Sequence, residues 1–364
     1  MTIINNDYAQ SFLSDYLRET EHIFYHALRK LDSTAECRIT PAADLCFPHD
    51  VIRLAGGFAT GCLVEWRSRV PVVPIDTTVN IDTTSIFYIS ERVEFSSERF
   101  ESFKKSIEER SSYEWNFNKG NHFISYCRRK SDGAPALVIH SNEKEFKYQF
   151  NGLMPVKDNW YMDSVHTTNV GSRYLRLLIG EKCATFYRIA KMLENYNIVR
   201  HAFVARSLIG DRSTVVNEYH KNHYFMPGPE AVAIGCYLCT KNEVVPVLSA
   251  PGNDICLFQV HSGGNNKLRM LGGKETFIVP HGFGKTSNCP VTMHASKDTL
   301  EINGISFENT PKSSIGLHPA LCTRYSTDDP QVFFDDIKHH TPGMIVDRFE
   351  QIQWYNKNGF GRNH

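Results

Sequence analysis

Two histidines at the open end of a predicted β-hairpin are the first residues that could do chemistry. Residues 122–128 and 135–140 are rich in β-branched and aromatic side chains, and Ser131–Gly133 between them is typical of a turn. A turn centred on Ser131 places His122 opposite His140, with Cβ atoms about 4.5–5.5 Å apart. Two imidazoles at that separation can bind one metal ion. The alternative is an ordinary hairpin with two polar ends.

A third histidine stands in a glycine-rich segment late in the chain. Pro280–Lys285 reads Pro-His-Gly-Phe-Gly-Lys. Gly282 and Gly284 allow a backbone to approach a phosphate closely, and Lys285 supplies positive charge. His281 could then attack a nucleotide phosphate and form a phosphoramidate. The segment is not a P-loop, because the required glycine five residues before Gly284 is absent. The alternative is a strand that ends in a turn with a histidine facing solvent.

Other polar residues have the types and spacings of metal ligands. Asp82 and Ser85 precede the apolar strand predicted at Ile86–Ile89, and both could offer oxygen atoms to a divalent ion. An aspartate at this place is also common in an ordinary turn. His220 and His223 have an H-x-x-H spacing, but their polar flanks favour a surface loop.

The elements that must position these residues are predicted from periodicity. Apolar residues at helical spacing indicate helices over Tyr8–Leu31, with Asp7 as N-cap, and over Ser172–Tyr196. A charged helix is expected at Ser96–Arg110, and residues 231–353 read as short strands between turns. We find no repeat or linker. The sequence therefore predicts one large α+β domain of mixed and antiparallel strands with flanking helices, comprising an N-terminal helical segment (1–40) and a core (41–364).

Composition excludes several classes of protein. Apolar content of 41% and charged content of 22% are those of a folded globular chain. Lys+Arg and Asp+Glu both number 40, which argues against a protein that coats nucleic acid or membrane by bulk charge. No signal peptide or transmembrane run is apparent, and ten scattered cysteines are typical of reduced, buried thiols. We therefore expect a cytoplasmic protein with no membrane association.

Taken in order, the polar segments resemble the RtcB family of RNA-splicing ligases, over roughly residues 45–357. Asp82 falls on the aspartate of the family's V-G-V-D-I-G-C segment. Gly120–Phe123 reproduces its G-N-H-F, and Val138–Ser141 resembles its next metal-histidine segment. Pro280–Lys285 resembles its S-H-G-A-G-R loop, and Tyr355–Gly359 resembles its terminal lysine-glycine. The resemblance implies joining of RNA 3′-phosphate or 2′,3′-cyclic phosphate ends to 5′-hydroxyl ends, with GTP and Mn²⁺ as cofactors.

The resemblance also implies roles for individual residues. His281 would be the residue guanylylated by GTP. The implied metal ligands are Asp82, Ser85, His122 and His140. The implied nucleotide-binding residues are Asn121, Asn217, Gly282, Gly284, Lys285 and Lys357.

Four departures from the family pattern change what is expected. Ser85 replaces the family's bridging cysteine and is a poorer ligand for a borderline ion. The family's H-N motif falls on Val216-Asn217, so its second-metal histidine is missing unless His220 or His223 substitutes. Ser125 replaces a glutamate that reads guanine. Lys285 replaces an arginine, keeping charge but losing the bidentate fork. We therefore expect one Mn²⁺ ion rather than two.

Three functions follow from these observations. The first is a divergent GTP-dependent RNA ligase used in tRNA splicing or RNA repair. The second is a non-ligating RtcB-like module that binds RNA and a metal. The third is another metal-dependent nucleotidyl transferase that uses His281. Metal-dependent joining of cleaved RNA would exclude the second, and preference for ATP would favour the third.

Overall fold

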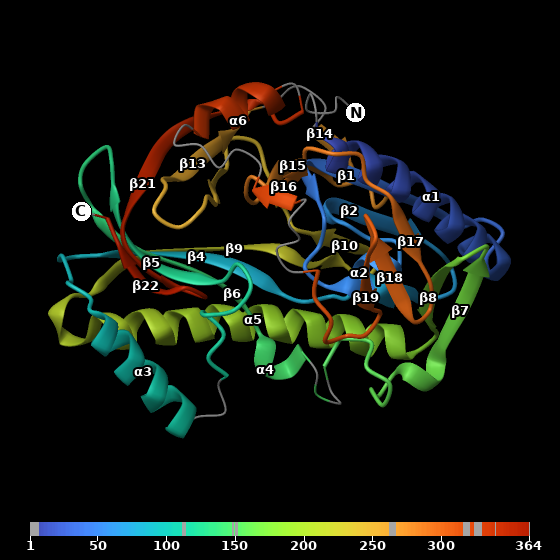
Figure 1. Cartoon of the computed structure of the whole chain (residues 1–364), viewed down its shortest axis with the longest axis horizontal. Coiled ribbons are helices and arrows are strands. Elements are labelled where there is room, and N and C mark those ends of the chain that lie inside the picture. Colours follow the sequence, from blue (N-terminus) through green and yellow to red (C-terminus); the bar gives the residue numbers. More distant parts are fainter. Residues whose placement is uncertain are drawn as a thin grey trace.

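One eleven-stranded antiparallel sheet positions the candidate site and combines strands from both ends of the chain (Figure 1). The spatial order is β1-β2-β10-β9-β4-β6-β5-β21-β13-β12, with β22 paired to β21. The bounds are β1 Glu36–Cys46, β2 Thr60–Arg67, β4 Asp82–Ile89, β5 Phe123–Arg129, β6 Pro135–Asn142, β9 Val215–Gly228, β10 Ala231–Ile234, β12 Val244–Val247, β13 Ile255–Val260, β21 Gly343–Asn356 and β22 Gly359–Arg362. This computed structural model describes residues 7–110, 114–147, 149, 152–261, 267–315, 321–323, 330–338 and 340–363.

Smaller sheets and helices surround the large sheet. Three of the smaller sheets have three strands each. They consist of β3 Val72–Pro74, β7 Val165–Val170 and β8 Arg173–Ile179; of β11 Cys236–Cys239, β14 Lys267–Arg269 and β15 Glu275–Pro280; and of β17 Met293–Ala295, β18 Thr299–Ile302 and β19 Ile305–Glu308. The fourth has two strands, β16 Lys285–Ser287 and β20 Leu321–Thr323. The α-helices are α1 Tyr8–Leu31, α2 Val51–Ala55, α3 Ser97–Arg110, α4 Lys144–Lys147, α5 Lys182–Ile209 and α6 Pro330–Ile337. The 3₁₀ turns are η1 Ile75–Thr77, η2 Met162–Ser164 and η3 Gly210–Arg212.

The central strands β4, β6 and β9 separate two layers of side chains. Successive residues of a strand point to opposite faces of the sheet. Phe87 of β4 packs with Ala205 and Leu208 of α5, which runs along one face of the sheet (Figure 1). Ile86, the neighbouring residue, packs instead with Val138 of β6 on the other face. Two side chains of β4 therefore lie on the same face of the sheet only if their residue numbers differ by an even number.

Two helices predicted from local signals are confirmed. Helix α1 begins and ends where the apolar spacing predicts, and the Asp7 carboxylate accepts a hydrogen bond from the Gln10 N–H at 3.2 Å, as an N-cap does. Helix α3 covers Ser97–Arg110. Both helices are specified by signals within a few residues, which explains why the sequence alone predicts them.

The predicted hairpin is confirmed, but its register is shifted by one residue. Phe123, not His122, pairs with His140. The loop closes through the Arg129 N–H and the Ala134 carbonyl at 2.9 Å, so the axis of the turn lies between residues 131 and 132 rather than on Ser131. His122 precedes the strand, where its N–H donates to the Lys119 carbonyl.

The prediction of a helix over Ser172–Tyr196 is wrong in its first part and too short at its end. Residues 173–179 form β8, which pairs with both β3 and β7. Gly180, at φ +93°, ends that strand, and α5 then continues to Ile209. The leucines of β8 have a spacing that also suits a helix, and pairing with the preceding strand β7 and with the distant strand β3 decides the outcome.

The predicted surface loop around His220 and His223 is also wrong. Both residues lie in β9, a fourteen-residue strand between β4 and β10. His223 is 2% exposed. A shift of register between Asp82 and Thr83 of β4 leaves His223 without a direct partner in the ladder, as in a β-bulge. The polar residues of the segment divide between solvent, at Asn217 and Glu218, and a buried site, at His223.

The elements form a single α+β domain, which confirms the predicted fold class at this level. All strand pairs described by the structure are antiparallel, apart from an isolated parallel bridge between Leu248 and Gly282. None of the helices in the described ranges is long and apolar enough to cross a membrane. The first six residues, where the sequence predicts no signal peptide, lie outside those ranges.

Candidate functional site

Four histidine rings lie in a row on the face of the sheet that α5 does not cover. The ring centroids of His122 and His140 are 5.7 Å apart, those of His140 and His223 are 4.9 Å apart, and those of His223 and His281 are 4.6 Å apart. The last two rings are nearly parallel, at 7°. The row therefore joins the hairpin, β9 and the end of β15 in one site.

His281 is held by a buried carboxylate at one end of the row. Its Nδ1 lies 2.9 Å from Asp44 Oδ2 and 2.5 Å from the Gly235 carbonyl oxygen. Because both neighbours are acceptors, Nδ1 carries the proton, and Nε2 keeps its lone pair in the neutral ring. Burial lowers the pKa of His281, but the hydrogen bond and the charge of Asp44 outweigh it and raise the pKa above its ordinary value.

The two middle rings are buried and electrically neutral. Neither ring nitrogen of His140 makes a hydrogen bond of normal geometry, and the same holds for Nδ1 of His223. Burial lowers the pKa of His140 to about 3. The charge of Asp82 opposes this shift, and the charges of His122 and His281 add to it. Burial, His281 and His140 lower the pKa of His223 well below its ordinary value. Lone pairs of neutral imidazoles are available as metal ligands here.

His122 and Asp82 form the other end of the row. The Nδ1 atom of His122 lies 3.1 Å from the Asn116 carbonyl oxygen, so Nε2 faces Asp82 Oδ1 at 3.7 Å. The Asn80 amide donates to the other Asp82 oxygen at 3.3 Å. The structure thus brings together three of the predicted metal ligands, Asp82, His122 and His140, and adds His223.

The glycine-rich segment leads into β16, whose first residue is Lys285, four positions after His281. Gly282 lies against the Leu248 backbone, and Gly284 has φ +71°, a conformation that favours glycine. Burial lowers the pKa of Lys285, and the charge of Lys357, at the turn between β21 and β22, lowers it further. These two predicted nucleotide-binding lysines therefore face one region although 72 positions separate them.

Ser85 lies apart from the histidine row, on the face of the sheet covered by α5. Its hydroxyl is 2.8 Å from Nδ1 of His201 and 2.8 Å from Nδ1 of His220. Three positions separate Ser85 from Asp82, and Ser85 is flanked in the ladder by Ile139 and His220. The structure does not bring this predicted ligand together with His140.

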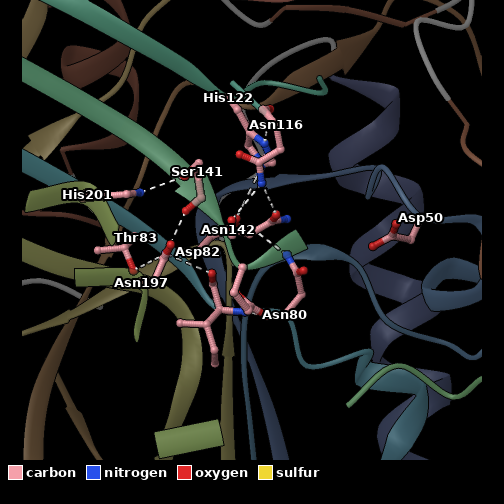
Figure 2. Close-up of polar contacts among 12 residues, drawn as sticks. Asp50, Asn80, Asp82, Thr83, Asn116, His122, Ser141, Asn142, Asn197 and His201 are labelled. Atoms are coloured by element: carbon pink, nitrogen blue, oxygen red, sulfur yellow. Dashed lines mark hydrogen bonds and ion pairs between the residues drawn. The ribbon is translucent and has the colours of Figure 1, made fainter. Parts of the chain in front are cut away.

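A buried arginine of α5, Arg200, lies at the end of β6. The Nη1 atom of Arg200 donates to the Ser141 hydroxyl and to the Asn142 carbonyl, each at 2.9 Å, and its Nε lies 2.9 Å from Glu145 Oε1. Ser141 also bonds His201 Nε2 at 2.8 Å. Figure 2 shows the Ser141–His201 bond to one side of Asp82 and Asn142, with Asp50 apart from the group.

Both asparagines among the predicted nucleotide ligands are exposed. Asn121 lies in the turn before β5, next to His122, so it borders the site. Asn217 pairs with Tyr88 near the far end of β4, six positions from Asp82, or about 20 Å along a strand. The structure does not bring Asn217 to the histidine row.

The donor types suit one divalent ion, although the side chains are not arranged around one. His122, His140 and His223 offer imidazole nitrogen, and Asp82 offers carboxylate oxygen, a set that binds borderline divalent metals. Within the described residues, no group of three or more His, Cys, Asp or Glu side chains is arranged to hold a metal ion. The orphaned nitrogens of His140 and His223 are the observation that a metal would explain.

Sequence reasoning missed Asp44 and His201 and placed His223 in the wrong environment. Asp44 lies in a turn-rich stretch of the sequence and gives no local signal. His201 occupies the apolar face of α5, beside Ala202 and Val204. A histidine inside a helical apolar stripe was the one available signal for His201.

Comparisons with family models, with curated proteins and with solved structures find no match for this chain.

Proposed function

We propose that this protein is a divergent GTP-dependent RNA ligase in which His281 is the nucleophile. The observation that carries the proposal is the Asp44–His281 pair, which fixes the proton on Nδ1 and leaves Nε2 as the attacking atom. The neighbouring Lys285 and Lys357 suit a triphosphate, and the resemblance to the RtcB family supplies GTP and RNA as the reactants. Comparisons with known proteins neither support nor oppose this choice.

The reaction proceeds in three substitutions at phosphorus. Nε2 of His281 attacks the α-phosphate of GTP, a P–N bond forms, and pyrophosphate leaves. An oxygen of an RNA 3′-phosphate then displaces the imidazole, so the P–N bond breaks and the guanylyl group passes to the RNA. The 5′-hydroxyl of a second RNA end attacks the activated phosphate, loses its proton, and releases GMP.

The surrounding residues act on His281 and on the phosphate charge. Asp44 stabilises the imidazolium that exists while the P–N bond is intact, since its carboxylate is 2.9 Å from Nδ1. Lys285, close to the glycine-rich turn, offsets charge on the phosphates. A divalent ion held by Asp82, His122, His140 and His223 would neutralise further phosphate charge.

A joining assay tests the proposal. Wild-type protein, GTP and MnCl₂ are incubated with one RNA ending in a 3′-phosphate and another beginning with a 5′-hydroxyl. We expect a joined product with the wild type and with His294→Ala, a control at an exposed histidine of β17, and none with His281→Ala. A product formed with ATP in preference to GTP would instead identify another nucleotidyl transferase.

A second function, a non-ligating module that binds RNA, is favoured by one observation. Ser85 replaces the family's cysteine and faces His201 and His220 rather than the histidine row. A site without its bridging ligand could retain RNA binding after losing catalysis. RNA binding that survives chelation, together with no joined product under any nucleotide, would establish this alternative.

A further inference from the structure

A surface pocket of about 680 Å³ lies away from the histidine row, where three elements meet. It is lined by the residues before and at the start of α3, by the end of α5 with η3, and by β22. In Figure 1 these elements meet at the end of the molecule where the C-terminus lies. A volume of this order accommodates a nucleotide-sized group.

Two arginines that form no ion pair within the described residues, Arg99 and Arg212, line this pocket. Arg99 donates to the Leu208 carbonyl at the end of α5, and its guanidinium carbon lies 5.6 Å from the centroid of the Phe95 ring. Burial lowers the pKa of Arg99, and the charge of Arg212 lowers it further. Arg99 is partly buried and Arg212 is exposed, and an anion in the pocket that both residues line could pair with both.

Three carboxylates share the lining of the pocket with three arginines, and two of these carboxylates have other partners. Glu94 forms an ion pair with Arg362 at 2.9 Å. Arg362 is the third arginine of the lining, so its charge already has a partner. Glu98 is fully exposed, and hydrogen bonds from its own backbone and from Ser96 lower its pKa, as expected in the first turn of a helix. Asp211 is the remaining carboxylate of the lining. Arg99 and Arg212 are thus the cations best placed for a ligand.

The strand β22 joins this pocket to the candidate site. Lys357 lies at the turn of the β21–β22 hairpin, and its charge lowers the pKa of Lys285, four positions after His281. Phe360 and Arg362, farther along β22, line the pocket. Five residues from Lys357 to Arg362 span about 16 Å of strand. An aromatic ring with arginines is the combination that binds single-stranded nucleic acid, by stacking on bases and pairing with phosphates.

We propose that this pocket binds the sugar-phosphate backbone of a single-stranded RNA a few nucleotides from the end that reacts at His281. The inference rests on the proposed function for the identity of the ligand. Arg99 and Arg212 contact phosphate, and Phe360 offers a stacking surface. Contacts of this kind position an RNA without reading its sequence.

The test is RNA affinity measured by fluorescence anisotropy, with a labelled twelve-nucleotide RNA that ends in a 3′-phosphate. For Arg99→Gln/Arg212→Gln we expect binding roughly 10-fold weaker at about 100 mM salt, and a slope of log affinity against log salt reduced by about 1.4. The matched control is Arg18→Gln/Arg188→Gln, which removes two exposed arginines from α1 and α5 and should leave both quantities unchanged. Arg99→Lys/Arg212→Lys should keep the wild-type slope.

Guanylylation of His281 needs no RNA, so it separates this inference from the proposed function. An RNA affinity of Arg99→Gln/Arg212→Gln equal to that of the control would overturn the inference, even if His281 is guanylylated normally. Loss of RNA affinity in a protein that GTP does not label would support the pocket and contradict the ligase proposal. Wild-type protein that fails to bind the RNA would overturn the inference.

Discussion

At the scale of single residues, the decisive feature is the pairing of His281 with Asp44. Asp44 is fully buried, and its carboxylate holds both the ring and the backbone N–H of His281. The residue pair combines a fixed tautomer with a raised pKa. Only neutral His281 can attack phosphorus, so we expect guanylylation to accelerate as the pH rises through this raised pKa.

Replacing Asp44 tests the pair directly. Asp44→Asn should slow guanylylation of His281 by roughly 10²–10⁴-fold, since the amide neither fixes the tautomer nor stabilises the imidazolium. The pKa of His281, followed by NMR, should fall. The control Asp158→Asn removes an exposed carboxylate and should change neither quantity. An unchanged His281 pKa in Asp44→Asn would contradict the assigned pairing.

The Asp44–His281 pair also makes the free energy of unfolding depend on pH. A histidine whose folded pKa is raised contributes stability that is complete below its unfolded pKa and is lost as the pH rises through the folded pKa. Asp44→Asn should therefore reduce the free energy of unfolding more at pH 5.5 than at pH 9. Urea denaturation at the two pH values measures the difference, and equal losses would show that the pair is not charged in the folded protein.

At the scale of elements, the bend between β10 and β11 brings the Gly235 carbonyl to His281. Gly235 has φ +68°, and an added Cβ would lie 2.4 Å from Thr60 Cγ2. The backbone can follow this path only with glycine. The short connection between the two strands thus contributes to the candidate site as well as to the fold.

Gly235→Ala should destabilise the protein by about 2–4 kcal/mol, from backbone strain and the clash with Thr60. Gly133→Ala is the matched control, because Gly133 has a similar φ of +73° but open space around its Cβ position. It should cost about 1 kcal/mol. Thermal or urea denaturation of both variants checks the difference, and equal costs would mean that the bend relaxes easily.

Helix α5 supplies Arg200, whose removal should be more damaging than that of an exposed arginine. Arg200→Met leaves Glu145, itself buried, without its cation, at a cost of about 3–5 kcal/mol. Arg206→Met breaks the exposed pair with Glu218 and should cost less than about 1 kcal/mol. Chemical denaturation compares the two, and similar losses would contradict the structural role of Arg200.

The elements that the sequence predicts well are those specified locally. Helix α1 has its cap and its periodicity in one stretch, and the hairpin has turn residues between two β-rich runs. Strand β8 could not be distinguished from a helix, because its leucines suit both periods and pairing with β3 and β7 selects the strand. The environment of His223 depends on β4 and on the rings of His140 and His281, far away in the sequence, so its burial carries no local signal.

At the scale of the whole molecule, strands from the first and last hundred residues enclose buried neutral histidines. His140, His201 and His223 each have a pKa lowered first by burial. Below their ordinary pKa of about 6.5, the unfolded chain takes up protons that the folded protein excludes. Stability therefore falls as the pH drops, for His140 over the range from about 6.5 to about 3.

This acid sensitivity can be measured on metal-free protein. Each excluded proton contributes about 1.4 kcal/mol of lost stability per pH unit. His140→Phe keeps an aromatic ring and removes one such proton, so the free energy of unfolding between pH 6 and pH 4 should depend less steeply on pH by about that amount. An unchanged slope, measured by urea denaturation with a chelator present, would show that His140 is protonated in the folded state.

The most direct test of the central claim is the covalent labelling of His281. Purified protein is incubated with GTP and MnCl₂, and the modified residue is identified by peptide mass spectrometry at neutral to alkaline pH, because the phosphoramidate is acid-labile. We predict a single GMP adduct on His281, absent from His281→Ala and present in His294→Ala. No adduct on the wild type, or an adduct elsewhere that persists in His281→Ala, would contradict the account.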